Sequence, residues 1–151
     1  MIKVMIIDDH PLVADGIQMM LKDVDYLCVV ATVKTAAGAI QFLDNNEPEI
    51  ILLDINLPDM DGLHLCNLIR EKNKYSKIIV LTSANDSSII TQMLHLGANG
   101  YLLKNMERDE FLEAINKVLE GKIFLSTAAN EKVLEQFSSV STALYGLPAL
   151  T

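Results

Sequence analysis

The sequence predicts an α/β protein: a doubly wound, five-stranded parallel sheet of the flavodoxin-like (βα)5 type, followed by a short C-terminal extension. Two observations predict this fold. Short apolar runs alternate with helical patterns five times along the chain, as in parallel sheets whose crossover helices cover both faces. The apolar runs also lack polar alternation, which is what strands buried on both faces require. The flavodoxin-like strand order is an expectation from this fold class, because order does not follow from the sequence alone.

Each strand is expected where a short apolar run ends at a polar residue, and each helix where apolar residues recur at helical spacing. Pro11 suits the first turn of the first helix, because its φ is fixed and it lacks an N–H group. Gly97 and Gly121 are expected to end the last two helices. The expected strands cover residues 4–7, 27–33, 50–54, 78–82 and 100–103. The expected helices cover residues 11–21, 36–43, 63–69, about 87–96 and 107–119.

The length of the chain limits the number of domains. It has 151 residues, of which 50% are hydrophobic, so it can form one domain with a substantial core but not two full-sized domains. We expect a domain over residues 1–121 and an extension over residues 122–151. Within the extension, residues 131–137 could form a short helix and residues 138–142 a linker.

The charge of the chain excludes some partners for this segment. Its formal net charge of -8 argues against binding to nucleic acid or to an anionic membrane, because phosphate contacts need a basic face. The apolar run at the N-terminus is too short for a signal peptide and is followed by acids. No stretch approaches the ~20 apolar residues of a membrane span. We therefore expect a cytoplasmic protein with no membrane partner.

Polar side chains follow the ends of several expected strands. They are Asp8 and Asp9 after the first strand, Asp54 in the third, Thr82 in the fourth and Lys104 after the fifth. The carboxyl ends of parallel strands meet at one edge of the sheet, where open α/β folds bind their ligands. Three converging carboxylates would repel one another unless a cation neutralised them, and oxygen ligands with open positions suit Mg²⁺. The sequence therefore predicts a magnesium site at this edge.

The same edge could carry out phosphoryl chemistry. A carboxylate such as Asp54 can attack phosphorus and form an aspartyl phosphate. Mg²⁺, Lys104 and the Thr82 hydroxyl are the kinds of group that would balance charge on the transferring phosphoryl group. The chain has neither a glycine-rich phosphate loop nor the glycine fingerprint of dinucleotide binding.

Simpler interpretations stay open for some of these residues. Asp8 and Asp9 could be acids at a helix N-terminus, and Lys104 could be a solvated surface lysine. His10 is interpreted as a helix-capping or loop residue in preference to a ligand, because hard cations prefer oxygen. The two cysteines lack metal-ligand spacing and are expected to be small buried hydrophobes.

Four motifs together resemble the receiver domain of two-component response regulators. They occur in the same order as in that family, and the resemblance covers residues 2–121. The motifs are Ile6-Ile7-Asp8-Asp9-His10, Leu52-Leu53-Asp54-Ile55-Asn56-Leu57-Pro58-Asp59-Met60-Asp61-Gly62, Val80-Leu81-Thr82-Ser83 and Gly97-Ala98-Asn99-Gly100-Tyr101-Leu102-Leu103-Lys104.

This resemblance implies a phosphoacceptor and a metal site. Asp54 would accept a phosphoryl group from a sensor histidine kinase. The cofactor would be Mg²⁺, held by Asp9, Asp54 and the backbone carbonyl of Asn56, with Asp8 helping through water. Such a protein is a switch and not an enzyme, beyond self-phosphorylation from small donors and self-dephosphorylation.

The resemblance also implies how the switch works. Thr82 and Lys104 would contact the phosphoryl group, and Tyr101 would turn inward as Thr82 moves; a fixed, half-buried Tyr101 is the alternative. Many receivers have proline after this lysine, whereas Asn105 follows it here. A cis peptide bond at this position is therefore less secure, because non-proline cis bonds cost ~3 kcal/mol.

Two segments resemble the NarL/FixJ subfamily in particular, namely Asp9-His10-Pro11 and residues 100–104. Its members usually carry a LuxR-type helix-turn-helix after a linker, and Leu150-Thr151 looks like the start of that domain. We therefore expect a receiver from a transcription regulator, which binds DNA only through a missing C-terminal domain and can form a homodimer on phosphorylation.

Two alternatives stay open. One is a single-domain receiver that acts by docking to a protein or by passing phosphate along a relay. The other is a Mg²⁺-dependent phosphatase with Asp54 as its transient nucleophile. A phosphatase would need a general acid near the acceptor, and Asn56, an amide, cannot serve as one.

Overall fold

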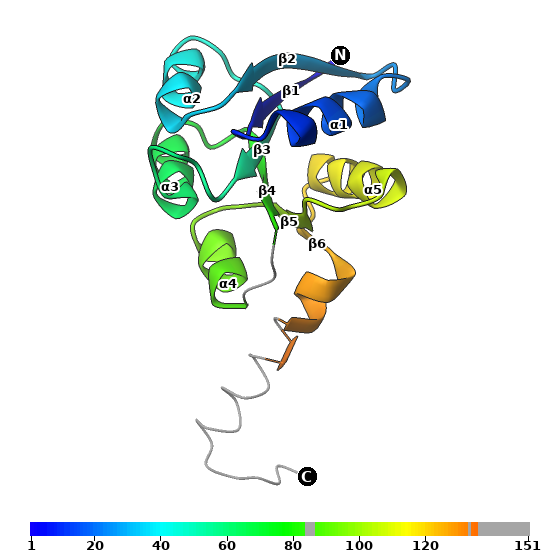
Figure 1. Ribbon diagram of the computed structural model, residues 1–151. Coiled ribbons are helices and arrows are strands. Elements are labelled where there is room, and N and C mark those ends of the chain that lie inside the picture. Colours follow the sequence, from blue (N-terminus) through cyan, green and yellow to red (C-terminus); the bar gives the residue numbers. More distant parts are fainter. Residues whose placement is uncertain (84–86, 133, 136–151) are drawn as a thin grey trace, which may run out of the picture.

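The protein forms a six-stranded parallel sheet with helices on both faces (Figure 1). The computed structural model describes residues 1–83, 87–132 and 134–135. The strands are β1 (Ile2–Ile7), β2 (Leu27–Val33), β3 (Ile50–Asp54), β4 (Lys77–Thr82), β5 (Gly100–Leu103) and β6 (Phe124–Leu125). The helices are α1 (Pro11–Leu21), α2 (Ala36–Leu43), α3 (Gly62–Lys72), α4 (Ser87–His95) and α5 (Arg108–Leu119).

The strand order is β2-β1-β3-β4-β5-β6, and all paired strands run parallel. Its first five members follow the flavodoxin-like order, so the predicted fold class is confirmed. β1 and β3, which lead to the predicted acids, both lie inside the sheet and not at its edges. Because β1 and β3 are neighbours, the residues that end them emerge side by side.

Two hydrophobic cores cover the two faces of the sheet. α1 and α5 cover one face, and α2, α3 and α4 cover the other (Figure 1). Alternate residues of β1 divide between them: Val4 and Ile6 join the first core, whereas Met5 and Ile7 join the second. All four are fully buried, which explains why β1 lacks polar alternation.

The prediction of five strands was wrong by one. After α5, Gly121 adopts a φ of 84° and the chain turns back along the edge of the sheet, where β6 pairs with β5. The backbone N–H of Phe124 donates to the Asn99 carbonyl at 2.9 Å, and that of Ser126 donates to the Tyr101 carbonyl at 3.0 Å. A strand of two residues is too short to leave a periodic signal in the sequence, so pattern reasoning could not detect it.

The segment after β6 is helical at residues 127–132 and 134–135, so this helix begins four residues earlier than predicted. Ser126 caps it, because its Oγ accepts a hydrogen bond from the Ala129 N–H at 3.2 Å. Ala129 is fully buried and belongs to the core beneath α4. The predicted linker at 138–142 and Leu150-Thr151 lie outside the described residues, and the division after residue 121 stays a prediction.

The loop from β3 to α3 is held in a fixed shape. The Gly62 N–H donates to the Ile55 carbonyl at 3.0 Å, and a side chain at Gly62 would collide with the Ile55 backbone. Asp59 crosses to the N-terminus of α2, where its two carboxylate oxygens accept the N–H groups of Ala36 at 2.8 Å and Ala37 at 3.0 Å. These two hydrogen bonds lower the pKa of Asp59.

The amino-terminal edge of the sheet is closed by the side chain of Arg70, near the end of α3. Its guanidinium donates to the carbonyls of Gly97 at 2.9 Å, Ser76 at 2.6 Å and Asn73 at 3.2 Å, and to Asn99 Oδ1 at 2.6 Å. Burial lowers the pKa of Arg70, although the nearby Cys66 opposes that change. Four acceptors thus surround one rigid donor fork.

None of the helices within the described residues combines the length and the apolar character that crossing a lipid bilayer requires. Both cysteines are free: Cys66 is buried, as predicted for a small hydrophobe, and Cys28 is half-buried. Burial raises the pKa of the Cys66 thiol.

Candidate functional site

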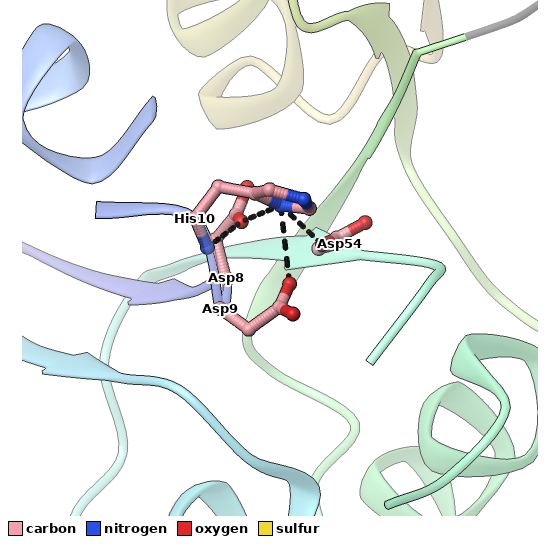
Figure 2. A group of neighbouring side chains, drawn as sticks. All are labelled: Asp8, Asp9, His10 and Asp54. Carbon is pink, nitrogen blue, oxygen red and sulfur yellow. Dashed lines mark hydrogen bonds and ion pairs between the residues drawn. The ribbon is translucent and has the colours of Figure 1, made fainter. Parts of the chain in front are cut away.

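The predicted acids meet at the carboxyl edge of the sheet, together with His10 (Figure 2). β1 ends at Ile7, which pairs with Leu53, so Asp8 and Asp54 are the next residues on two adjacent strands. The Asp8 N–H donates to the Val33 carbonyl at 3.0 Å, which ties this strand end to β2 as well. Neighbouring parallel strands therefore fix where both carboxylates lie.

Asp54 is the last residue of β3, and it is completely buried. Its Oδ1 accepts the N–H of Asn56 at 3.0 Å, and its Oδ2 lies 2.9 Å from Lys104 Nζ. Burial raises the pKa of Asp54 and the charge of Asp8 raises it further, while the Asn56 N–H and Lys104 oppose both. The charged form of Asp54 thus depends on cationic neighbours.

Lys104 reaches this site from the end of β5. Its backbone N–H donates to the Thr82 carbonyl at 2.8 Å, and its side chain is only 12% exposed. Besides Asp54, Nζ lies 3.3 Å from Asp8 Oδ2 and 3.0 Å from His10 Nδ1. A solvated surface lysine is therefore the wrong interpretation. All peptide bonds within the described residues are trans, including the one between Lys104 and Asn105.

Asp8 and Asp9 lie before helix α1 and not within its first turn, which contains no acid. Asp8 Oδ1 accepts the His10 N–H at 2.8 Å. Within the described part of the chain, three buried carboxylate oxygens have no backbone or amide donor, and their polar neighbours are Lys104 Nζ and His10 Nδ1. These oxygens are Asp8 Oδ2, Asp9 Oδ1 and Asp54 Oδ2. Three carboxylates against one lysine leave an excess negative charge.

This donor set fits a divalent cation. The ligating atoms of Asp8, Asp9, His10 and Asp54 all lie within 4.8 Å of one another, and oxygen atoms that lack a backbone or amide donor are available to bind. Oxygen donors of this kind are what Mg²⁺ prefers. Asp9 and Asn56 also line one pocket of about 320 Å³, and the role of the Asn56 carbonyl as a ligand stays a prediction.

His10 is a loop residue at the N-terminus of α1, as interpreted, and its side chain also lies in the site. It occupies the residue before α1, but its side chain makes no capping hydrogen bond. Its Nδ1 instead lies 2.9 Å from Asp8 Oδ1, 3.1 Å from Asp9 Oδ1 and 3.6 Å from Asp54 Oδ2 (Figure 2). The only sequence signal for this was its position directly after two acids that end a strand.

Thr82 and Tyr101 extend the site inward. Thr82 ends β4 and is 2% exposed, and it pairs with Leu103 in β5. Tyr101 is 1% exposed and belongs to the same core as Ile90 and Met93 of α4. Tyr101 therefore lies on the face of the sheet that α2, α3 and α4 cover, and it is buried and not half-buried. Its movement on phosphorylation stays a prediction.

Comparison with known proteins identifies the family. The model of the response regulator receiver domain matches residues 4–116. The nitrate/nitrite response regulator protein NarL of Escherichia coli K12 is 33% identical over 125 residues, which are 83% of this chain and 58% of NarL. The chain therefore spans less than two thirds of the length of this relative.

Solved structures of response regulators also superpose on this chain. A LuxR-family two-component response regulator from Aurantimonas sp. SI85-9A1 superposes with a TM-score of 0.84 at 26% identity, covering 90% of this chain and 97% of that one. A structure of two RcsB dimers bound to two parallel DNAs gives a TM-score of 0.81 at 27% identity, covering 87% of this chain and 67% of that one. The chain belongs to the response regulator receiver domain family.

Proposed function

We propose that this receiver accepts a phosphoryl group on Asp54 from a sensor histidine kinase in the cytoplasm and acts as the switch of a two-component system. One observation carries the proposal: the buried Asp54 carboxylate, whose Oδ2 lies 2.9 Å from the Lys104 ammonium, beside two further acids. Asp54 Oδ1 is occupied by the Asn56 N–H, so Oδ2 is the oxygen that attacks.

In the transfer, Asp54 Oδ2 forms a bond to phosphorus while the bond from phosphorus to the kinase histidine breaks, and the imidazole takes that electron pair. Asp9, Asp54 and the Asn56 carbonyl would hold Mg²⁺, with Asp8 acting through water. When bound, the cation supplies positive charge that lets an anionic phosphoryl group approach a carboxylate. Lys104 keeps its contact with the acceptor and neutralises a phosphoryl oxygen.

The switch then follows from new contacts to the attached group. It adds nearly two negative charges and acceptor oxygens, which attract the Lys104 ammonium and the Thr82 hydroxyl. Tyr101 lies in one core with Ile90 and Met93, so a shift of Thr82 changes the packing beneath α4. The surface formed by α4, β5 and α5 would respond, and a partner or second copy binding there would sense phosphorylation.

Regulation of transcription is the proposed output of the full-length protein. The relatives that carry this argument are NarL, a response regulator, and RcsB, which was solved as dimers bound to DNA. By analogy, a homodimer formed on phosphorylation would act on DNA through a further C-terminal domain. A single-domain receiver that docks to proteins is the alternative, and the length of the full reading frame distinguishes the two.

The experiment is phosphorylation by a small acyl phosphate donor, followed by mass spectrometry of the intact chain. The wild type should gain one phosphoryl group in the presence of Mg²⁺ and none in the presence of a chelator. Asp54→Asn should gain none under either condition. Asp61→Asn is the matched control, because it changes an exposed acid in the loop after β3 and should still be modified.

Incorporation of an acyl phosphate into Asp54→Asn would contradict the assignment. Unimpaired incorporation into the wild type in the presence of the chelator would contradict the role of the cation.

A further inference from the structure

We propose that His10 is itself a ligand of the divalent cation, through Nδ1, and that this nitrogen makes the site prefer later first-row cations such as Co²⁺ over Mg²⁺. The inference rests on the proposed function, which places a cation among the same acids. It adds a nitrogen donor to a set that was expected to contain oxygen alone.

The distances around Nδ1 are those of adjacent ligands on one ion. Donors bound at about 2.1 Å in octahedral geometry are about 3.0 Å apart when adjacent and about 4.2 Å apart when opposite. Nδ1 lies 2.9 Å from Asp8 Oδ1, 3.1 Å from Asp9 Oδ1 and 3.6 Å from Asp54 Oδ2. The widest separation in the cluster, up to 4.8 Å, exceeds the opposite-ligand distance by well under 1 Å. Small movements of the ligands, together with withdrawal of Lys104 Nζ from Nδ1, would close the shell.

The neighbours of Nδ1 make conflicting demands that a cation would resolve. Lys104 Nζ, at 3.0 Å, can only donate, so it requires a lone pair on Nδ1. Ionised Asp8, at 2.9 Å, can only accept, so it requires a proton on Nδ1. One nitrogen cannot meet both requirements. A cation bound to the lone pair of Nδ1 and to an Asp8 oxygen would satisfy the ring and the carboxylate, with the ring proton on Nε2. Lys104 would then keep Asp54 and Asp8 as its partners.

The backbone holds the ring in this position. The His10 carbonyl accepts the N–H groups of Val13 at 3.1 Å and Ala14 at 3.2 Å, which fixes it to the first turn of α1. Its own N–H is held by Asp8 Oδ1 at 2.8 Å. Hydrogen bonds on both sides of the residue therefore hold its backbone next to the acids that the imidazole contacts, whereas 55% of the side chain remains open to water. Ligand water can leave along that side.

The chemical consequence concerns which cation binds. Mg²⁺ is hard and gains little from imidazole, whereas affinity for nitrogen donors rises along the first row from Mn²⁺ through Co²⁺ to Ni²⁺. A site made of carboxylates and a carbonyl alone discriminates less between these ions. With His10 bound to the cation, the affinity for Co²⁺ should exceed the affinity for Mg²⁺. Removal of the imidazole should reduce this ratio.

The test compares binding of Co²⁺ and Mg²⁺ to the 151-residue chain by isothermal titration calorimetry at one fixed pH. His10→Phe keeps a ring but removes both nitrogens, and it should weaken Co²⁺ binding by about tenfold or more, the scale on which changes around a metal alter its affinity. Binding of Mg²⁺ should change by less than about twofold. His95→Phe, at the last residue of α4, is the matched control and should alter neither.

A spectroscopic measurement identifies the ligand directly. Mn²⁺ bound to the wild type should show nitrogen modulation in pulsed electron paramagnetic resonance, and this signal should be absent from His10→Phe. For His10→Gly, added imidazole should restore the nitrogen signal, which also covers the case in which the phenylalanine variant folds poorly.

Equal losses for both cations, no loss for either, or a wild-type Mn²⁺ spectrum without nitrogen modulation would each overturn the inference and leave the phosphoacceptor proposal standing. Absence of any divalent cation binding to the wild type would overturn both.

Discussion

The two edges of the sheet treat buried charge in opposite ways. At the amino-terminal edge, the Arg70 guanidinium donates four hydrogen bonds, to Gly97, Ser76, Asn73 and Asn99. At the carboxyl edge, the carboxylates of Asp8, Asp9 and Asp54 lie close together beside one lysine, Lys104. The charge of Arg70 is therefore paired with carbonyl and amide oxygens, whereas the charges of the three carboxylates lie close together.

This difference separates a structural role from a functional one. Arg70 links the end of α3 to the segments that lead into β4 and β5, so its hydrogen bonds hold elements together. The acids at the other edge repel one another, and an arrangement that costs folding free energy is retained where binding needs it. The same kind of substitution should therefore have opposite effects on stability at the two edges.

The largest effect is expected for Arg70→Met. Methionine fills similar space but leaves four acceptors without their donor, so the free energy of unfolding should fall by about 3 kcal/mol. Urea unfolding followed by circular dichroism measures this change. Lys72→Met is the control on the same helix, and it should change stability by less than about 0.5 kcal/mol because that side chain is 77% exposed. A loss as small as that of the control would remove the contrast between the edges.

Asp54→Asn should have a smaller effect of opposite sign. The pKa of Asp54 is raised in the folded protein, so its ionisation opposes folding once the pH rises above the ordinary aspartate range. In chelator at pH 7, the variant should be more stable by about 1–2 kcal/mol, the size seen when buried charges are replaced. Below the ordinary aspartate pKa the gain should disappear. Destabilisation at pH 7 would mean that the ion pair with Lys104 outweighs the repulsion.

The smallest effect is expected for Asp59→Asn. This variant tests whether the effect of an acid on stability is set by its hydrogen-bond partners or by its position near the carboxyl edge. Asp59 belongs to the loop after β3, yet its carboxylate is paired with the N–H groups of Ala36 and Ala37. Its lowered pKa means that it stabilises the fold above the ordinary aspartate pKa and loses this contribution as the pH falls through the lowered value.

At pH 7 the melting temperature of Asp59→Asn should be roughly 1–3 °C below that of the wild type, and the gap should close in acid. Asp15→Asn, an exposed change on α1, should leave the melting temperature unchanged. If Asp59→Asn were more stable than the wild type at pH 7, the position of an acid near this edge, and not its hydrogen bonds, would decide whether it stabilises the fold.

Much of the fold and site could be predicted because each depends on a local pattern with a strong physical cause. Uninterrupted apolar runs occur in β1, β3 and β4 because these strands have a core on each face. Acids that end such runs must emerge at one edge once the strands are parallel, which brought Asp8 and Asp54 together. Lys104 joins them because its N–H pairs with the end of β4.

Other features left no local signal. β6 consists of two residues, and its pairing follows a turn at Gly121. A glycine in the sequence predicts that the chain turns, but not which strand it pairs with afterwards. The direction of the His10 ring depends on hydrogen bonds made by its backbone, and donor chemistry alone favoured excluding it from a magnesium site. Tyr101 is buried in a core that also contains residues of α4 and Ala129, which lies 28 residues later in the chain. Spacing within one segment cannot reveal such contacts.

The pairing of Ser126 with Tyr101 has a mechanical consequence. The Tyr101 carbonyl accepts the Ser126 N–H at 3.0 Å, and Ser126 in turn caps the helix that begins at residue 127. A helix fixed at its first turn behaves as a lever, because a small rotation at the pivot becomes a larger displacement further along its axis. The pivot here is attached to the backbone of the residue proposed to move. A tilt of β5 would therefore reorient the helical residues 127–132, even if no exposed side chain changed its rotamer.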